Sequence, residues 1–146
     1  MIAKHWPDWF LAKVGGAWPS TYVALDVETT GFRKNDEPGK RADIITEIGY
    51  VEVENNAPVN RATVVVDWTR DPAVDQKWLR QRLLDRDGQI AADGGVATDS
   101  YADLAAKGRP AKDVFRETLA WLESKAADRV PVVMHNGYGF DENFLS

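Results

Sequence analysis

The chain has 146 residues, a net charge of −5, six tryptophans and no cysteine. This length predicts one domain. The lack of cysteine excludes disulfides and thiolate metal sites, and it fits a cytoplasmic protein. No apolar run approaches the roughly 20 residues that a membrane span needs. The charge argues against a protein that holds nucleic acid by neutralising many phosphates, but leaves open a small acidic site that meets phosphates through metal ions.

The first residues predict a short helix outside the main domain. Trp6, Phe10 and Val14 are spaced as on one face of an amphipathic helix, and a Gly-Gly-Ala-Trp-Pro-Ser segment then ends it. We therefore expect an N-terminal helical extension over residues 1–19 and the main domain over 20–146.

Three strands are predicted next, close together in the chain. Residues 21–28 and 62–68 are rich in β-branched and aromatic residues, and residues 44–55 alternate between apolar and polar. A polar loop over 29–43 and a turn over 55–60 separate them. Such short connections favour an antiparallel meander.

The hydrophobic period then changes to that of helices. Helices are expected over residues 71–84, 98–108 and 110–126, and a loop is expected over 88–100. In the second helix, Thr98 or Asp99 would be the N-terminal cap and Gly108 would end the helix. The apolar segment 130–136 predicts a fourth strand, buried on both faces as in parallel pairing. The order predicts an α/β domain with a mixed sheet.

Two acids at the end of the first strand are candidates for chemistry. Asp26 and Glu28 are two residues apart, so both side chains should leave the same face, with Cα atoms about 7 Å apart. No basic residue lies in this strand to neutralise them, and Mg²⁺ or Mn²⁺ would do so with oxygen ligands. In isolation, such a pair most often only faces water.

A third acid follows the fourth predicted strand. Asp141 comes shortly after residues 130–136. If the first and fourth strands are parallel neighbours, Asp26, Glu28 and Asp141 converge at one carboxyl edge of the sheet, where ligand sites of α/β folds occur. Three carboxylates there would favour bound metal at neutral pH.

The segments "VALDVETTG" and "HNGYGFDENFL" together resemble the DEDD (DnaQ-like) superfamily of 3′–5′ exonucleases. The resemblance covers residues 20–146 and includes "EIG" at 47–49. It implies an RNase H-like fold, in which antiparallel strands 1–3 are joined by strand 4 parallel to strand 1, with flanking helices.

The resemblance also implies roles for individual residues. Asp26 would bridge two divalent ions, Glu28 would ligate one of them and Asp141 the other. Phosphodiester hydrolysis would then use two metals about 4 Å apart, Mg²⁺ or Mn²⁺, at the 3′ end of single-stranded DNA or RNA. The implied substrate-binding positions are Thr29, Thr30, Gly31, Phe32 and Asn136.

Several other residues have simpler interpretations. Phe32 could equally cover the core, and structural roles are favoured for Glu47 and His135. Two basic clusters have interleaved acids and are expected to be solvated faces: Arg33, Lys34, Lys40 and Arg41, and Lys77, Arg80, Arg82 and Arg86. The first cluster borders the predicted site, where contact with a phosphate backbone is the alternative.

The family pattern requires a third motif after Asp141, with a His or Tyr near the attacking water and a fourth Asp. Ser146 is the last residue, so we expect a C-terminally incomplete domain that binds metal weakly and hydrolyses little. The alternative function is a non-catalytic nucleic-acid-binding or scaffold module. Such a module would associate with another chain or its own copy through an open edge of the sheet. A polymerase is a further partner that we consider.

Overall fold

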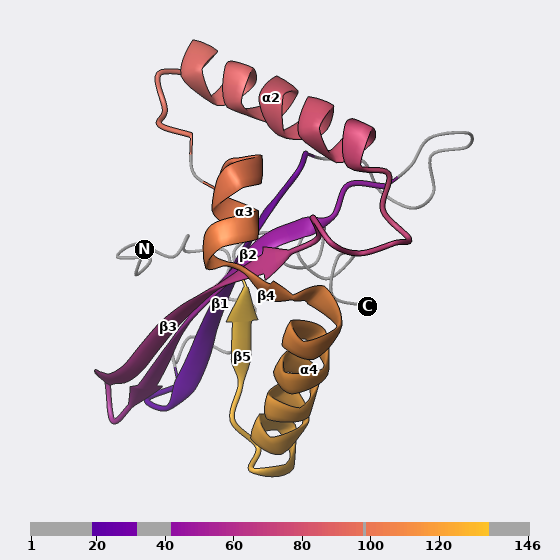
Figure 1. Cartoon of the computed structure of the whole chain (residues 1–146). Coiled ribbons are helices and arrows are strands. Elements are labelled where there is room, and N and C mark those ends of the chain that lie inside the picture. Colours follow the sequence, from indigo (N-terminus) through magenta and orange to yellow (C-terminus); the bar gives the residue numbers. More distant parts are fainter. Residues whose placement is uncertain (1–18, 32–41, 98, 135–146) are drawn as a thin grey trace.

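A computed structural model describes residues 19–31, 42–97 and 99–134 (Figure 1). Over these ranges the chain forms one mixed sheet with helices packed against it. The helix predicted within residues 1–19 lies outside the described residues, so the proposed division at residue 20 stays a prediction.

Within the described ranges, the sheet has five strands in the order β4-β3-β2-β1-β5. They are β1 (Tyr22–Thr29), β2 (Ile45–Glu54), β3 (Ala57–Asp67), β4 (Arg109–Pro110) and β5 (Val132–Met134). The pairs β1–β2 and β2–β3 are antiparallel, whereas β5 runs parallel to β1. This confirms the predicted α/β class, the antiparallel meander and the parallel last strand. The two-residue β4, which pairs with the end of β3, was not predicted.

The hairpin between β2 and β3 is tighter than the sequence indicated. The turn consists of Asn55 and Asn56, both with positive φ, 50° and 66°. Asparagine tolerates this conformation, which matches the twist of a two-residue hairpin. The predicted turn over 55–60 is therefore wrong beyond Asn56, because β3 already begins at Ala57.

Three helices are described: α2 (Gln76–Ala92), α3 (Tyr101–Lys107) and α4 (Ala111–Ala127). The predicted loop over 88–100 is partly wrong, because α2 continues through Gly88 to Ala92. Ser100 caps α3 in a reciprocal capping box with Asp103, and Gly108 ends that helix as expected. The predicted cap at Thr98 or Asp99 was therefore placed too early.

Two apolar clusters hold the helices to the sheet. Under α4, the cluster consists of Leu25, Val27, Ile45, Ile48, Val66, Ala111 and Val114. Under α2 and α3, it consists of Val74, Leu79, Leu83 and Leu104. Trp68 packs against both clusters, and its indole N–H donates to the Ile45 carbonyl at 2.6 Å. Figure 1 shows α4 alongside the sheet and α2 beyond the end at which β1 and β5 finish.

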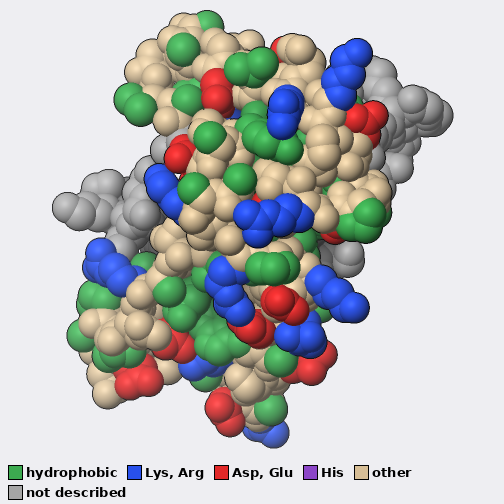
Figure 2. All heavy atoms as spheres, viewed as in Figure 1, with side chains coloured by type: hydrophobic (Ala, Val, Ile, Leu, Met, Phe, Trp, Pro, Cys, Tyr) green, Lys and Arg blue, Asp and Glu red, His purple; other side chains and the backbone are tan. Residues whose placement is uncertain are grey.

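The surface mixes both signs of charge. On the face seen in Figure 2, Lys and Arg side chains are spread over the molecule, with Asp and Glu between them. This agrees with the small negative net charge. None of the helices within the described ranges is both long and apolar enough to cross a membrane.

Candidate carboxylate site at the end of strand β1

Asp26 and Glu28 share one face of β1, as the alternation of the strand predicted. Leu25 and Val27 point the other way and are buried under α4, whereas both acids are exposed. Across the antiparallel pair, Asp26 lies opposite Gly49. The glycine leaves the Asp26 carboxylate without a side chain beside it on β2.

The Glu28 carboxyl lies in an environment that disfavours its charge. Partial burial raises its pKa, and the negative charges of Asp26 and Asp99 raise it further. The Arg86 guanidinium opposes this shift but does not cancel it. A cation placed between these carboxylates would reverse the balance, because opposite charge favours the ionised form.

The turn after β1 is tightly bonded to itself and to β2. Thr29 and Thr30 are buried, the latter completely. The Thr29 hydroxyl donates to the Gly31 carbonyl at 2.6 Å and accepts from the Gly31 N–H at 3.3 Å. The Thr30 N–H donates to the Ile44 carbonyl at 3.0 Å. The Thr30 hydroxyl also accepts from the Ile44 N–H at 3.1 Å, so both threonine side chains have structural partners.

A buried ion pair between α2 and Asp43 supports the turn after β1. Arg82 of α2 donates two hydrogen bonds to Asp43, from Nε at 2.9 Å and from Nη2 at 2.6 Å. The Asp43 carboxylate is inaccessible to solvent and also accepts the Thr30 hydroxyl at 2.7 Å. A Cβ on Gly31 would collide with the Arg82 guanidinium. Only glycine fits against this pair without a shift of the guanidinium.

Arg86, one turn further along α2, joins three segments. Its Nη1 donates to the Thr29 carbonyl at 3.3 Å and to the Thr46 hydroxyl at 3.4 Å. Its Nη2 donates to the Asp99 carbonyl at 3.1 Å and pairs with Asp87 at 3.0 Å. One guanidinium thus forms hydrogen bonds with the end of β1, the start of β2 and the segment before α3.

These bonds correct the interpretation of the second basic cluster. The prediction of a solvated face is wrong for Arg82 and Arg86, whose side chains are 17% and 10% exposed. Lys77 and Arg80 are exposed as expected, and Arg80 lies over the Tyr101 ring at 4.3 Å from its centroid. Helical spacing alone does not predict this difference, because the acid that pairs with Arg82 and the carbonyls and hydroxyl that accept from Arg86 come from other segments.

The structure brings two further acids to the site. Glu47 lies directly opposite Glu28 on β2, and its carboxyl is in hydrogen-bond contact with that of Asp99. Burial, this hydrogen bond and the charges of Asp99, Glu28 and Asp26 raise the pKa of Glu47 to about 8. Sequence reasoning favoured a structural Glu47 and treated Asp99 only as a helix cap. The acidic cluster was therefore larger than expected.

The remaining predicted site residues lie outside the described residues: Phe32, Asn136 and Asp141, together with His135 and the basic cluster Arg33, Lys34, Lys40 and Arg41. The strand that precedes this last segment is described. Met134 of β5 lies opposite Leu25, one residue before Asp26. Within 19–31, 42–97 and 99–134, no group of three acidic or histidine side chains is arranged to hold a metal ion.

Comparison of the chain with models of known protein families and with curated proteins finds no match.

Proposed function

We propose that this chain is a metal-dependent 3′–5′ exonuclease domain of the DEDD type with an RNase H-like fold. One observation carries the proposal. Two exposed carboxylates, Asp26 and Glu28, share one face of β1, and the parallel neighbour β5 ends beside them. The chain following β5 carries Asn136 and Asp141, so the third carboxylate would arrive at the same edge of the sheet.

The proposed chemistry follows from the charge at this edge. Asp26, Glu28 and Asp141 would hold two divalent ions, Mg²⁺ or Mn²⁺. Bound there, such ions would supply Lewis-acid activation of water and stabilisation of charge on the leaving 3′-oxygen. The raised pKa of Glu28 supports a cation there, since metal would replace the repulsion among the acids by attraction.

The proposed substrate is the 3′ end of single-stranded DNA or RNA, and the proposed location is the cytoplasm. Thr29, Thr30 and Gly31 would present the outer surface of their turn to the terminal nucleotide, with Phe32 and Asn136 beside it. Because the 146 residues contain no third motif, we expect slow hydrolysis. A positioned acid or base contributes about 10²–10⁴-fold.

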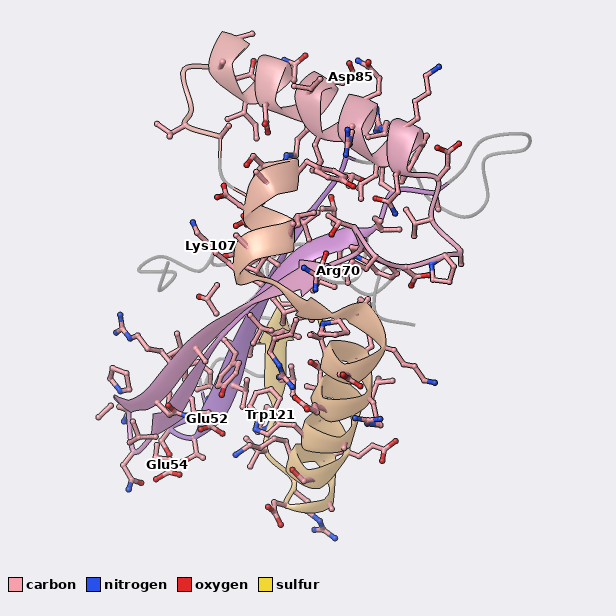
Figure 3. The ribbon with its side chains drawn as sticks, in the orientation of Figure 1. Glu52, Glu54, Arg70, Asp85, Lys107 and Trp121 are labelled. Atoms are coloured by element: carbon pink, nitrogen blue, oxygen red, sulfur yellow. The ribbon has the colours of Figure 1, made fainter. Side chains whose placement is uncertain are left out.

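The test is release of the terminal nucleotide from a single-stranded oligonucleotide with a 3′ label, with DNA and RNA measured separately. Slow release that requires Mn²⁺ and stops with a chelator is expected. Asp26→Asn should lower the rate at least about 100-fold, whereas Glu54→Gln, at the far end of β2 in Figure 3, should leave it unchanged. Equal rates for the parent and Asp26→Asn would contradict the proposal.

The alternative function is a non-catalytic module that associates through an open sheet edge. It is favoured by the position of β5, which is the outermost strand among those described and has an apolar sequence, Val132–Met134. Such an edge is a template for pairing with another strand. Sedimentation equilibrium distinguishes the two cases: a dimer lost on Val133→Lys, together with no Mn²⁺-dependent release, would favour the module.

A further inference from the structure

A β-bulge interrupts the pairing of β1 with β2 directly beside Glu28. Glu28 lies opposite Glu47, but the next residue of β1, Thr29, lies opposite Ile45. Thr46 is therefore the extra residue of β2 and has no partner on β1. A bulge bends its strand and changes the direction of nearby side chains, and bulges are common next to active sites. Whatever fixes this bulge therefore also fixes the strand end that carries Glu28.

Arg86 of α2 binds both strands at the bulge. Its Nη1 donates to the Thr29 carbonyl of β1 at 3.3 Å and to the Thr46 hydroxyl of β2 at 3.4 Å. Thr46 is completely buried, and the Arg86 side chain is only 10% exposed. Buried polar groups need hydrogen-bond partners, and here one guanidinium nitrogen serves a group from each strand.

The remaining nitrogens of the Arg86 guanidinium are also bonded. Nε and Nη2 both donate to Asp87 Oδ1, at 3.1 and 3.0 Å, and Nη2 also donates to the Asp99 carbonyl at 3.1 Å. Together with the bonds of Nη1, these match the five N–H donors of an arginine. Lysine carries the same charge on a single nitrogen, without the planar fork. A lysine at this position could not reach both strands and the other acceptors at once.

We propose that Arg86 is a positioning residue, which fixes the bulge at Thr46 and thereby the direction in which Glu28 presents its carboxylate to the proposed metal site. The inference rests on the proposed function, because it gives Arg86 a role toward that site. Arg86 itself would touch neither metal nor substrate. Its positive charge would oppose a bound cation by Coulomb repulsion, so its contribution to metal binding must come from geometry.

The test separates geometry from charge with two variants that keep the net charge. Arg86→Lys keeps the positive charge and loses the fork, and Thr46→Val keeps the side-chain shape and loses the hydroxyl. Thr46→Ser retains the hydroxyl and is the matched control. Mn²⁺ binding by the full chain is followed by the electron paramagnetic resonance signal of free Mn²⁺, and the ion that is lost in Asp26→Asn marks the site. Circular dichroism reports whether each variant is folded.

Arg86→Lys should weaken binding of this ion at least about tenfold, the usual minimum for groups that orient metal ligands. Thr46→Val should weaken it about two- to tenfold, as expected for one lost hydrogen bond, and Thr46→Ser should leave it unchanged. Folded Arg86→Lys that binds Mn²⁺ as tightly as the parent would overturn the inference. If Arg86→Lys does not fold, equal Mn²⁺ binding by Thr46→Val and Thr46→Ser would overturn it.

Amide hydrogen exchange with a chelator present tests the fixing of the bulge without metal. The Thr30 N–H donates to the Ile44 carbonyl at 3.0 Å, just beyond the bulge. In Arg86→Lys its exchange should become faster than in the parent, while amides in the middle of β2 change less. Leu104→Ala is the control, because it removes a buried side chain of α3 and should speed these amides together. No selective change at Thr30 in Arg86→Lys would also overturn the inference.

The experiment distinguishes failure of this inference from failure of the proposed function. Asp26-dependent Mn²⁺ binding that persists unchanged in Arg86→Lys contradicts this inference alone and leaves the exonuclease proposal standing. No Asp26-dependent Mn²⁺ binding by the parent contradicts the exonuclease proposal and, with it, the role of Arg86 toward the metal site.

Discussion

Two arginine–carboxylate pairs in this molecule are each joined by two short hydrogen bonds but lie in different surroundings. Arg82 and Asp43, below the candidate site, are joined by two hydrogen bonds of 2.9 and 2.6 Å. Arg109 and Glu117, where β4 leads into α4, are joined by two of 2.6 and 2.7 Å. The side chains of the first pair are 17% and 0% exposed, and those of the second are 51% and 50% exposed.

The two pairs should contribute very differently to stability, although both are bidentate. Both pairs have the bidentate arrangement that arginine and carboxylate prefer. In water, however, an exposed pair is screened and adds little, whereas a buried carboxylate that loses its partner remains as an uncompensated charge. Burial, rather than hydrogen-bond length, should therefore decide how much each pair matters.

The largest expected effect comes from breaking the buried pair. Arg82→Met should lower the free energy of unfolding by about 3–5 kcal/mol, because it removes a positive charge and two hydrogen bonds from the buried Asp43 carboxylate. Urea unfolding measures this. The double variant Arg82→Met/Asp43→Asn removes the charge and should recover part of the loss. A loss below about 1 kcal/mol in the single variant, as expected for a surface pair, would contradict the idea that burial makes the Arg82–Asp43 pair important for stability.

A second way to disturb the buried pair is through its neighbour Gly31. Gly31→Ala should cost about 1–3 kcal/mol by overpacking, because the new methyl would meet the Arg82 guanidinium and lie 2.6 Å from Asp43 Oδ2. Gly88→Ala is the matched control, since a Cβ there meets nothing within 4 Å in the middle of α2. It should stabilise by about 0.5–1 kcal/mol. Equal effects of the two substitutions in urea unfolding would be evidence against close packing at Gly31.

The acidic groups at the end of β1 predict that the free energy of unfolding depends on pH. The pKa of Glu47 is raised from 4.5 to about 8 in the folded chain. Between these values the folded protein keeps a proton that the unfolded chain releases, so the free energy of unfolding should fall as pH rises through this window. Glu28, whose pKa is also raised, acts in the same direction.

Glu47→Gln should make this fall shallower, because glutamine has no proton to lose. The measurement is urea unfolding at several pH values with a chelator present, and Glu54→Gln is the control. A slope between pH 4.5 and 8 that is unchanged by Glu47→Gln would mean that Glu47 titrates normally.

The smallest effect is expected at the surface pair. Glu117→Gln should leave the urea midpoint unchanged within error, because solvent screens the Arg109–Glu117 attraction. For the same reason, 1 M NaCl should shift the urea midpoints of the parent and the variant equally. A destabilisation comparable to that of Arg82→Met would show that geometry outweighs burial.

Local sequence pattern was enough to predict much of the candidate site. The alternation of β1 correctly placed Asp26 and Glu28 on one face, opposite the buried Leu25 and Val27. The apolar segment 130–136 correctly predicted a strand parallel to β1, which the structure places at Val132–Met134. Both features depend on residues adjacent in the chain, whose period and polarity can be read directly.

Other features depend on residues far apart in the chain, and no local pattern predicts them. The basic residues of α2 were predicted to form one solvated face. Instead, Arg82 is buried against Asp43 and Arg86 against the end of β1. The extent of α2 was also missed, because burial of Leu79 and Leu83 against α3 and the sheet outweighs the helix-weakening effect of Gly88.

Local sequence patterns were sufficient to predict the α/β class, the meander, the parallel last strand and the pair of carboxylates on β1. The positions of Glu47 and Asp99 near this pair, and the support of the turn after β1 by α2, became visible only in the folded chain. Strand period and helix propensity act over neighbouring residues, whereas a charge becomes buried or paired only when distant segments meet.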